Sequence, residues 1–553
     1  MSERRSHDPS SPTFAVTQST EGTSPRIPSG GPRPDDTARS RNNGNGRQQT
    51  AERGIRTEAT VQPSPERVEA AGTATEKSHP ATASSGPGVE PQHSARPRSV
   101  QSPGGPSACG ASNTLDRWLA GRLRNAVGQA VCVELWDGWR TGDSEAAELT
   151  VRFANRATLW SLLRNRSVAF GEAYARGAIQ VRTARPDLPS CLPDGLHRNP
   201  LFAGDTQALI RLCELANAAS LRKQVGPARP LRRLRRNSLE RSRHNVYHHY
   251  DIGNEFYRLW LDRNLVYTCA YYHDWEAMTL EDAQIAKMDL VCRKVRLRPG
   301  LRVIEAGCGW GGLALYMARH YGVQVRAFNV SREQLAYARE RARREGLADR
   351  VEFVERDWRE IDGTCDAFVS VGMLEHVGPE NYVELGRVIR RVLKPDGLAL
   401  LHSIGRDRPG RLDPWIDRRI FPGAHPPSLR EMSAIFEAGN FSILDVENLR
   451  LHYARTLEDW LHRFEQHEQR VRAMYDEQFV RTWRLYLCGS IAAFRTGVLQ
   501  LFQVVFAHRG NHLVPLTRAH ILDGFPVGAT GPGAARPSGD REAPGAGVDA
   551  TDQ

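Results

Sequence analysis

The sequence predicts an α/β fold: a doubly wound Rossmann-like sheet, a smaller α+β amino-terminal domain before it, and a disordered tail at each end. Three observations support this prediction. From residue 299 onward, short apolar segments alternate with segments of helical spacing, which is typical of a parallel sheet covered by helices. Residues 113–226 mix strand and helix patterns without that alternation. Residues 1–112 contain one aromatic side chain, Phe14, and are too polar to bury a core.

The length and charge of the chain bound its organisation. Its 553 residues suffice for roughly two to four domains, and 75 Lys and Arg against 64 Asp and Glu give a net charge of +11. The composition of residues 1–112 returns in residues 525–553, so we predict a disordered tail at both places. Two folded domains are then predicted, over residues 113–226 and 227–524.

The same composition indicates a cytoplasmic protein. No apolar segment follows Met1, so we do not expect secretion. The most apolar stretch, residues 485–507, is interrupted by Arg495 and two glutamines, and we therefore expect no membrane-spanning helix. Nine cysteines without a C-x-x-C pair favour reduced thiols over disulfides or a zinc site, and we predict no metal.

The elements of the amino-terminal domain are predicted from capping and periodicity. Asn113 is placed to cap a helix whose apolar residues, Trp118 among them, recur at helical spacing. Residues 131–136 and 149–153 have the pattern of strands, and residues 159–164 that of a helix. Together they predict a small α+β unit.

A basic cluster follows this domain. Seven arginines and one acid lie between Arg229 and Arg243, with leucines among them. A solvated linker is one interpretation. The alternative is a docking segment for an anionic membrane surface, in which the leucines insert beside the charges. Since the chain has no recognised nucleic-acid module, we expect no binding to nucleic acid.

Strands and helices alternate from residue 299 in the order of a doubly wound sheet. Because the ligands of such sheets bind at the carboxyl ends of the strands, we expect the site where the first strands end. A Pro-Asp-Gly turn at residues 395–397 is predicted before the last strand. The predicted strands are residues 301–305, 323–330, 351–354, 367–371 and 398–403, and the first two helices between them are residues 313–320 and 332–346.

The glycine-rich loop after the first strand fits two cofactors. Residues 307–312 match G-x-G-x-x-G, the loop that holds a dinucleotide pyrophosphate. Together with Glu305 they also match E/D-x-G-x-G-x-G, the usual loop for S-adenosylmethionine. A nicotinamide enzyme would carry an acid at the end of the second strand, where this chain has Asn329. The loop therefore favours S-adenosylmethionine but leaves the nicotinamide cofactor open.

Five segments in order resemble those of the cyclopropane-fatty-acyl-phospholipid synthase family. A sixth segment, residues 170–174 in the first domain, is similar to the amino-terminal domain of longer bacterial members, so the resemblance covers nearly all of residues 113–524. It implies a Rossmann-like methyltransferase sheet and a lipid substrate. The five segments are residues 267–272 (YTCAYY), 305–312 (EAGCGWGG), 371–378 (VGMLEHVG), 401–404 (LHSI) and 500–506 (QLFQVVF).

The resemblance implies a reaction in which no side chain is the nucleophile. The cis double bond of an unsaturated phospholipid acyl chain attacks the sulfonium methyl of S-adenosylmethionine, and a proton is lost as a cyclopropane ring closes. The protein must align methyl and alkene, exclude water and hold a base beside the transferred carbon. In this family the base is thought to be a bound bicarbonate ion, which needs several hydrogen-bond partners.

The resemblance also implies which residues form the site. His376, beside one of them, is interpreted as structural, and Cys488 as a buried helix residue. The catalytic positions are Glu375, His402 and Tyr453 through their side chains, and Cys269 and Ile404 chiefly through backbone amides. The cofactor positions are Tyr267, Glu305, Gly307, Gly309, Gly311, Asn329, Gln334, Asp357 and Trp358.

The sequence leaves some properties open. The expected partners are an unsaturated phospholipid and the inner face of an anionic membrane, with which the enzyme associates peripherally. Related enzymes make methyl-branched or methylene-branched chains from the same cation, and the product type is not specified by the sequence. A nicotinamide-dependent oxidoreductase is the alternative from another class. The acyl chain, the headgroup and the oligomeric state, a homodimer included, are also open.

Overall fold

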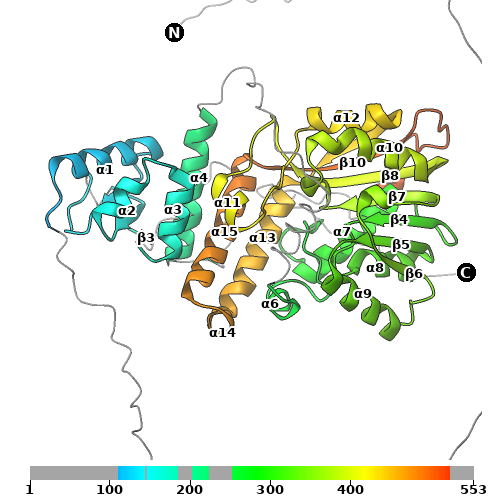
Figure 1. Cartoon of the computed structure of the whole chain (residues 1–553), viewed down its shortest axis with the longest axis horizontal. Helices are drawn as coiled ribbons and strands as arrows, with labels where there is room; N and C mark the ends of the chain where they lie inside the picture. The colour runs from blue at the N-terminus through cyan, green and yellow to red at the C-terminus, as the bar shows by residue number, and fades with distance from the viewer. Residues whose placement is uncertain (1–109, 143–145, 185–201, 203, 223–251, 523–553) are drawn as a thin grey trace, which may run out of the picture. The chain divides into compact units, whose positions relative to one another are not determined.

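The structure is a computed structural model that describes residues 110–142, 146–184, 202, 204–222 and 252–522 (Figure 1). All of these belong to one unit, Ser99–Gln553. The two predicted tails and the basic cluster between Arg229 and Arg243 lie outside the described residues. The predictions made for them therefore stay predictions.

The amino-terminal part is a three-stranded sheet flanked by helices. Strand β1 pairs with β2 in parallel, and β2 with β3 antiparallel. Asn113 accepts a hydrogen bond from the Asp116 amide and so caps the first helix, as predicted. The helix predicted at residues 159–164 lies earlier, because Asn155 and Asn165 each cap a separate short helix. The elements are α1 (Thr114–Val127), β1 (Val131–Glu134), β2 (Leu149–Phe153), α2 (Arg156–Ser161), α3 (Arg166–Ala175), β3 (Ile179–Thr183) and α4 (Gly204–Arg222).

The larger sheet has seven strands in the order β6-β5-β4-β7-β8-β10-β9. Its five parallel strands are those predicted, within a few residues. The antiparallel strands β9 and β10 were not predicted, since β10 is buried along its length and lacks strand alternation. The strands are β4 (Arg302–Ala306), β5 (Gln324–Asn329), β6 (Val351–Glu355), β7 (Cys365–Val371), β8 (Leu393–Gly405), β9 (Phe441–Asn448) and β10 (Gln500–His508).

The turn predicted at residues 395–397 is wrong. These residues lie inside β8, where the pairing with β7 advances from Cys365↔Leu393 to Ala367↔Leu398. The Pro-Asp-Gly sequence is therefore accommodated as a bulge within the strand rather than as a turn before it.

Helices cover both faces of this sheet and connect it to the amino-terminal part (Figure 1). Helix α15 packs against α13 and also against α3 and α4, so both parts share one apolar core. The helices are α6 (Asn254–Arg258), α7 (Leu280–Lys294), α8 (Gly312–Tyr321), α9 (Arg332–Arg344), η1 (Trp358–Glu360), η2 (Leu374–His376), η3 (Pro379–Asn381), α10 (Tyr382–Val392), α11 (Pro414–Arg419), α12 (Leu429–Gly439), α13 (Arg450–Gln466), α14 (Glu468–Met474), α15 (Glu477–Thr496) and α16 (Ala519–Leu522).

The apolar stretch at residues 485–507 is divided between two elements, the second half of α15 and most of β10. Within the described ranges, every helix is too short or too polar to cross a bilayer. The seven cysteines of these ranges form no disulfide with one another.

Candidate active site

Two cavities meet at the carboxyl ends of the parallel strands. The loop cavity, about 150 Å³ in volume, lies beside the glycine-rich loop that joins β4 to α8. The apolar cavity, about 720 Å³, lies between the sheet and the helices α3, α4, α13 and α15. Eight of the nine predicted cofactor residues line the loop cavity, and four of the five predicted catalytic residues line the apolar cavity.

The glycine-rich loop exposes its backbone to the loop cavity. The amides of Gly307 and Cys308 both donate to the Phe328 carbonyl, at 2.9 and 3.1 Å, and tie the loop to β5. Gly309 has a φ of 52° and open space where a Cβ would stand, so a ligand can approach the backbone there.

Gly311 is the predicted cofactor residue that does not line the loop cavity. It begins α8 with a φ of 80°, and a Cβ would lie 2.7 Å from the ring of Phe353. Its role in this structure is close packing between the loop and the sheet, not contact with a ligand.

Asn329 and Gln334 brace the loop from the side of β5. The Asn329 amide donates to the Gly309 carbonyl (3.2 Å) and to the Gln334 side-chain oxygen (2.9 Å). On the far side, Asp357 caps η1 and pairs with Arg359 at 2.7 Å, and the same guanidinium stacks over Trp358. All four predicted residues therefore line the cavity while holding its walls in place.

A buried acid and a buried amine face the loop cavity. Glu305 is buried, and its Oε2 atom has no hydrogen-bond partner among the described residues. Burial raises the pKa of Glu305 to about 8 and lowers the pKa of Lys287 to about 8. The Lys287 ammonium donates to the Thr268 hydroxyl at 2.8 Å. Glu305 Oε2 is thus an unsatisfied polar atom of a residue that lines the loop cavity.

Four residues line both cavities and form a shared wall: Tyr267, Thr268, Gly372 and His376. The Tyr267 hydroxyl lies 2.8 Å from the hydroxyl of Tyr486 on α15. A reacting group held in the loop cavity can therefore meet a substrate held in the apolar cavity.

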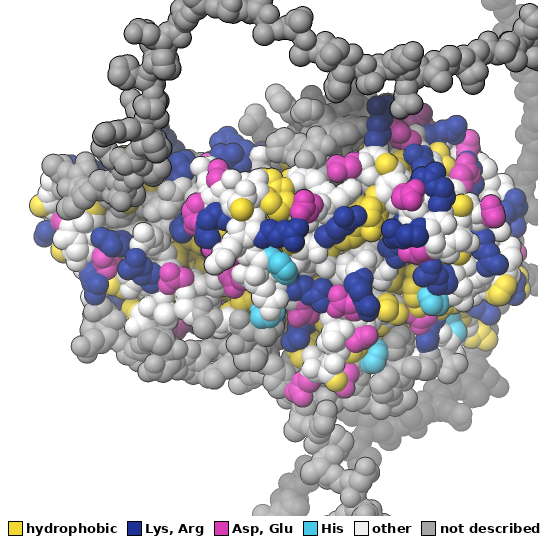
Figure 2. All heavy atoms as spheres, turned by 90° about the horizontal axis from the view of Figure 1, so that it is seen from below, with side chains coloured by type: hydrophobic (Ala, Val, Ile, Leu, Met, Phe, Trp, Pro, Cys, Tyr) yellow, Lys and Arg dark blue, Asp and Glu magenta, His cyan; other side chains and the backbone are white. Residues whose placement is uncertain are grey.

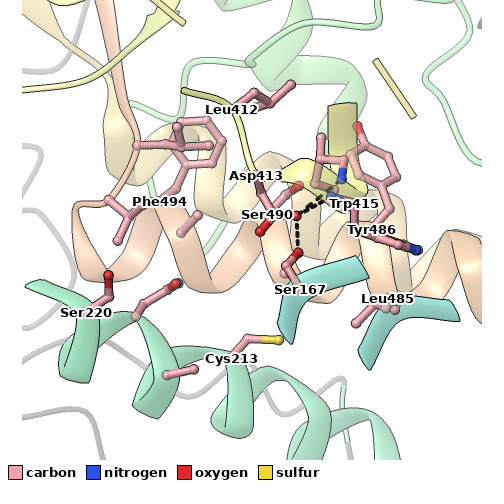
Figure 3. Close-up of a pocket in the computed structure, with 18 of the residues that line it drawn as sticks. Ser167, Cys213, Ser220, Leu412, Asp413, Trp415, Leu485, Tyr486, Ser490 and Phe494 are labelled. Carbon is pink, nitrogen blue, oxygen red and sulfur yellow. Dashed lines mark hydrogen bonds between the residues drawn. The ribbon is translucent and has the colours of Figure 1, made fainter. Parts of the chain in front are cut away.

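The apolar cavity is assembled from both parts of the chain (Figure 3). Cys213 of α4 faces Leu485 and Phe494 of α15 across it, and Trp415 closes it from α11. The Ser167 hydroxyl donates to Asp413 at 2.5 Å, which joins α3 to the segment before α11. Its mostly apolar lining suits an acyl chain and keeps water away from a reacting centre.

A polar cluster interrupts this apolar lining. It consists of Glu375 on η2, His402 and Ile404 on β8, and Tyr453 on α13. The Ile404 amide donates to Glu375 Oε1 at 2.6 Å, whereas Glu375 Oε2 has no partner among the described residues. Burial raises the pKa of the Glu375 carboxyl to about 7.

His402 presents the second unsatisfied atom of the cluster. Its Nδ1 lies 3.0 Å from the Gln503 amide nitrogen, and its Nε2 has no partner among the described residues. Burial and the charges of Lys287 and Lys294 hold the pKa of His402 well below its usual range, so the ring is neutral. Two orphaned polar atoms in an apolar cavity indicate a small polar ligand between them.

Cys269 follows Thr268 of the shared wall but does not itself line either cavity. It is fully buried, and its thiol donates to the Ala270 carbonyl at 3.1 Å. The Ile404 amide donates to the Glu375 carboxyl and so holds that side chain in place. Tyr453 packs against Phe494 with ring centroids 4.6 Å apart.

His376 and Lys287 belong to the site although sequence reasoning did not place them there. His376, interpreted as structural, lines both cavities, and burial lowers its pKa to about 4. Lys287 lies on α7, outside the motifs that carried the resemblance. The signal that could have identified it is a lysine among the apolar residues of a helix face.

The fold and the two cavities define the class of the protein: an S-adenosylmethionine-dependent methyltransferase with an apolar substrate. A family model described as "Mycolic acid cyclopropane synthetase" matches residues 237–504, and one described as a domain of unknown function matches residues 119–187.

Curated relatives extend this match to most of the chain. A "Probable fatty acid methyltransferase" of Pseudomonas putida is 34% identical over 399 residues, which are 70% of this chain and 94% of the relative. The "Cyclopropane-fatty-acyl-phospholipid synthase" of Escherichia coli K12 is 43% identical over 260 residues, 47% of this chain and 66% of the relative. The solved cyclopropane synthase MmaA2 of Mycobacterium tuberculosis is 30% identical with a TM-score of 0.46, covering 48% of this chain and 98% of its own.

The chain belongs to the mycolic acid cyclopropane synthetase family. It is an S-adenosylmethionine-dependent methyltransferase of the cyclopropane synthase type, which transfers a methylene carbon to a lipid double bond. Membership confirms the resemblance, the fold class and the cofactor inferred from the loop. It also decides against the nicotinamide-dependent oxidoreductase.

Proposed function

We propose that the enzyme acts on the cis double bonds of unsaturated acyl chains in phospholipids and closes a cyclopropane ring on them. The observation that supports this most is the shared wall: the loop cavity and the apolar cavity meet at Tyr267, Thr268, Gly372 and His376. The phospholipid synthase of Escherichia coli, a relative at 43% identity, supports the choice of substrate.

The residues of the loop cavity fit S-adenosylmethionine. When bound, this donor supplies an activated methyl group. Gly309 leaves room for it against the backbone, and the unpartnered Glu305 Oε2 is an acceptor for its ammonium group. Gln334 and Asp357 line the side where a ribose and adenine would lie. These residues bind and orient the donor so that its methyl faces the shared wall.

The polar cluster fits a bicarbonate ion, which both donates and accepts hydrogen bonds. Glu375 Oε2 would accept from its hydroxyl, and His402 Nε2 would face its oxygens. When bound, bicarbonate supplies the base for the proton that ring closure releases. Tyr453 and Ile404 form part of the wall of this site. We also propose that the backbone amide of Cys269 donates a hydrogen bond to the ion.

A phospholipid substrate requires docking on a bilayer, and we propose peripheral association with the anionic inner face of the membrane. On α1, Leu115 and Trp118 are 59% and 58% exposed, and the Arg122 guanidinium lies over the Trp118 ring. Figure 2 shows Lys and Arg interspersed with Asp and Glu on the face it draws. Because charges of both signs are mixed there, the basic cluster between Arg229 and Arg243 would contribute most of the electrostatic attraction to anionic lipid. This attraction should weaken as the salt concentration rises.

Co-sedimentation with anionic vesicles tests this docking. Replacing Arg232, Arg233, Arg235 and Arg236 together by Gln should weaken vesicle binding and activity on vesicles while leaving donor affinity unchanged. Unchanged vesicle binding would reject the basic cluster as the docking segment.

Mass spectrometry with a donor carrying a trideuterated methyl group tests the proposed product. The enzyme is incubated with vesicles of a defined cis-unsaturated phospholipid, and its acyl chains are analysed. Ring closure releases one deuteron of the transferred methyl, so the expected gain is a CD₂ unit. A methylene-branched chain gains the same unit, and ¹³C NMR of the product distinguishes its sp² carbons from those of a ring. A chain that keeps all three deuterons would be methyl-branched instead, and an unlabelled chain would overturn the proposal.

A further inference from the structure

His402 ends a row of polar side chains that crosses three strands and is buried except at Glu447, whose side chain is 34% exposed. His402 on β8 is paired with Gln503 on β10, and Gln503 with Glu447 on β9, so the three side chains share one face of the sheet. Lys294, the last residue of α7, donates to Gln503 Oε1 at 2.7 Å and to Glu447 at 2.5 Å. Gln503 is fully buried, and His402 and Lys294 are each 2% exposed.

Lysine can only donate hydrogen bonds, and this determines which way the side-chain amide of Gln503 is turned. An ammonium group has no lone pair, so the Gln503 atom that faces Lys294 must be the carbonyl oxygen. The amide NH₂ of Gln503 then faces His402 and donates to Nδ1 at 3.0 Å. A neutral imidazole that accepts at Nδ1 carries its proton on Nε2.

The Nε2 atom is the one that the polar cluster can use. It has no partner among the described residues, and His402 lines the apolar cavity together with Glu375. As the proton is on Nε2, the atom is a hydrogen-bond donor there, whereas the unpartnered Glu375 Oε2 is an acceptor when the carboxyl is ionised. The cluster thus offers one donor and one acceptor to the same ligand.

We infer that Gln503 is a positioning residue that fixes His402 as the Nε2–H tautomer, and that Lys294 orients Gln503 for this purpose. The consequence for turnover rests on the proposed function, but the tautomer itself does not. Glu447 and, at 4.0 Å, Asp445 neutralise Lys294, which lets a cation lie in the interior beside the row. At metal sites, the outer partners that set a histidine tautomer change activity about 10–100-fold when removed, and we expect an effect at the lower end of that range here.

Nitrogen NMR of the full chain with ¹⁵N-labelled histidine tests the tautomer directly. The His402 signals are assigned as those lost in His402→Ala, and no lipid, donor or bicarbonate is needed. We expect a protonated Nε2 and an unprotonated Nδ1 at neutral pH. A proton on Nδ1 in the wild type would overturn the inference, whatever the enzyme's substrate proves to be.

Two substitutions test the cause. In Gln503→Glu, the carboxylate can only accept, so Nδ1 should gain the proton, and turnover should fall about tenfold or more with donor affinity within about twofold. Lys294→Arg keeps a donor-only cation, and we expect it to preserve the wild-type tautomer. An unprotonated Nδ1 in a folded Gln503→Glu would refute the role of Gln503.

A control variant separates this effect from the loss of an ion-paired lysine elsewhere on the sheet. Lys394→Met removes a lysine that pairs with Asp366 at the other end of β8, far along the strand from His402. It should leave the His402 signals unchanged, whereas Lys294→Met should yield a mixture of both tautomers. If both methionine variants change the His402 signals alike, or neither does, Lys294 does not orient the row.

Discussion

The loop cavity and the apolar cavity are built in opposite ways. The loop cavity comes mainly from neighbouring segments, the carboxyl ends of the four parallel strands β4, β5, β6 and β7 and the glycine-rich turn between β4 and α8. The apolar cavity takes its lining from Leu123 on α1 to Leu501 on β10, over most of the described chain. Binding of the donor is thus a local property of the backbone, whereas the environment of the alkene is a property of the whole fold. Substitutions in the two cavities should have separable effects.

The largest effect should come from the polar cluster of the apolar cavity. Glu375→Gln keeps an acceptor for the Ile404 amide but removes the carboxylate, so turnover should fall about 10²–10³-fold. Donor affinity, measured by calorimetry, should stay within about twofold. His402→Ala and Tyr453→Phe should change turnover in the same direction. Equal losses of turnover and donor affinity would show that donor binding and the chemical step are not assigned to separate cavities.

The converse effect is expected in the loop cavity. In Gly309→Val the side chain fills the open space beside the backbone, and donor affinity should fall about 100-fold, roughly 3 kcal/mol. Gly346→Val is the control, since Gly346 also has a positive φ and open space but lines neither cavity. If the control loses donor affinity to the same extent, backbone strain rather than occupied space is the cause.

A smaller effect should follow from narrowing the apolar cavity. Gly489 on α15 lines this cavity, and a Cβ there meets open space, so Gly489→Leu should fit and reduce turnover several-fold, most for long acyl chains. Replacing a helical glycine should at the same time raise the melting temperature. Gly121→Leu on α1 is the matched control, because Gly121 also meets open space but lies outside both cavities. A reduced turnover in the control would argue against filling of the cavity.

The smallest effect concerns stability and pH. Burial raises the pKa of Glu375 from 4.5 to about 7, so the folded state favours the protonated carboxyl. The stability that this group contributes is therefore fully present below about pH 4.5 and is lost as the pH rises through about 7. The melting temperature of Glu375→Gln should exceed that of the wild type by a few degrees at about pH 8.5, and the gain should shrink at about pH 5. A pH-independent difference would contradict the raised pKa.

What could be predicted from the sequence follows the same division. Eight of the nine residues predicted for the cofactor line the loop cavity, because most of them lie on the glycine-rich turn or at the end of a parallel strand, where a doubly wound sheet holds its ligand. Gly311 is the exception, since only packing on Phe353 decides that it faces away from the cavity. The bulge in β8 was missed because Pro-Asp-Gly has the local pattern of a turn, which the pairing with β7 overrides.

The residues that line the apolar cavity could not be predicted from local sequence patterns. The catalytic positions came from resemblance, and nothing in periodicity distinguishes Glu375 from its neighbour His376, which lines both cavities. The row behind His402 depends on the register of β9 and β10, two strands that were not predicted. Cross-strand contacts of this kind appear only when the sheet order is known.

Turnover measured against bicarbonate concentration tests the division most directly. The wild type, Glu375→Gln and Gly309→Val are assayed in buffer freed of carbon dioxide and then with added bicarbonate. Wild-type turnover should rise to saturation while donor affinity stays constant. Glu375→Gln should lose this response, and Gly309→Val should keep it when the donor is in excess. Wild-type turnover that is indifferent to bicarbonate would contradict the polar cluster as the site of the base.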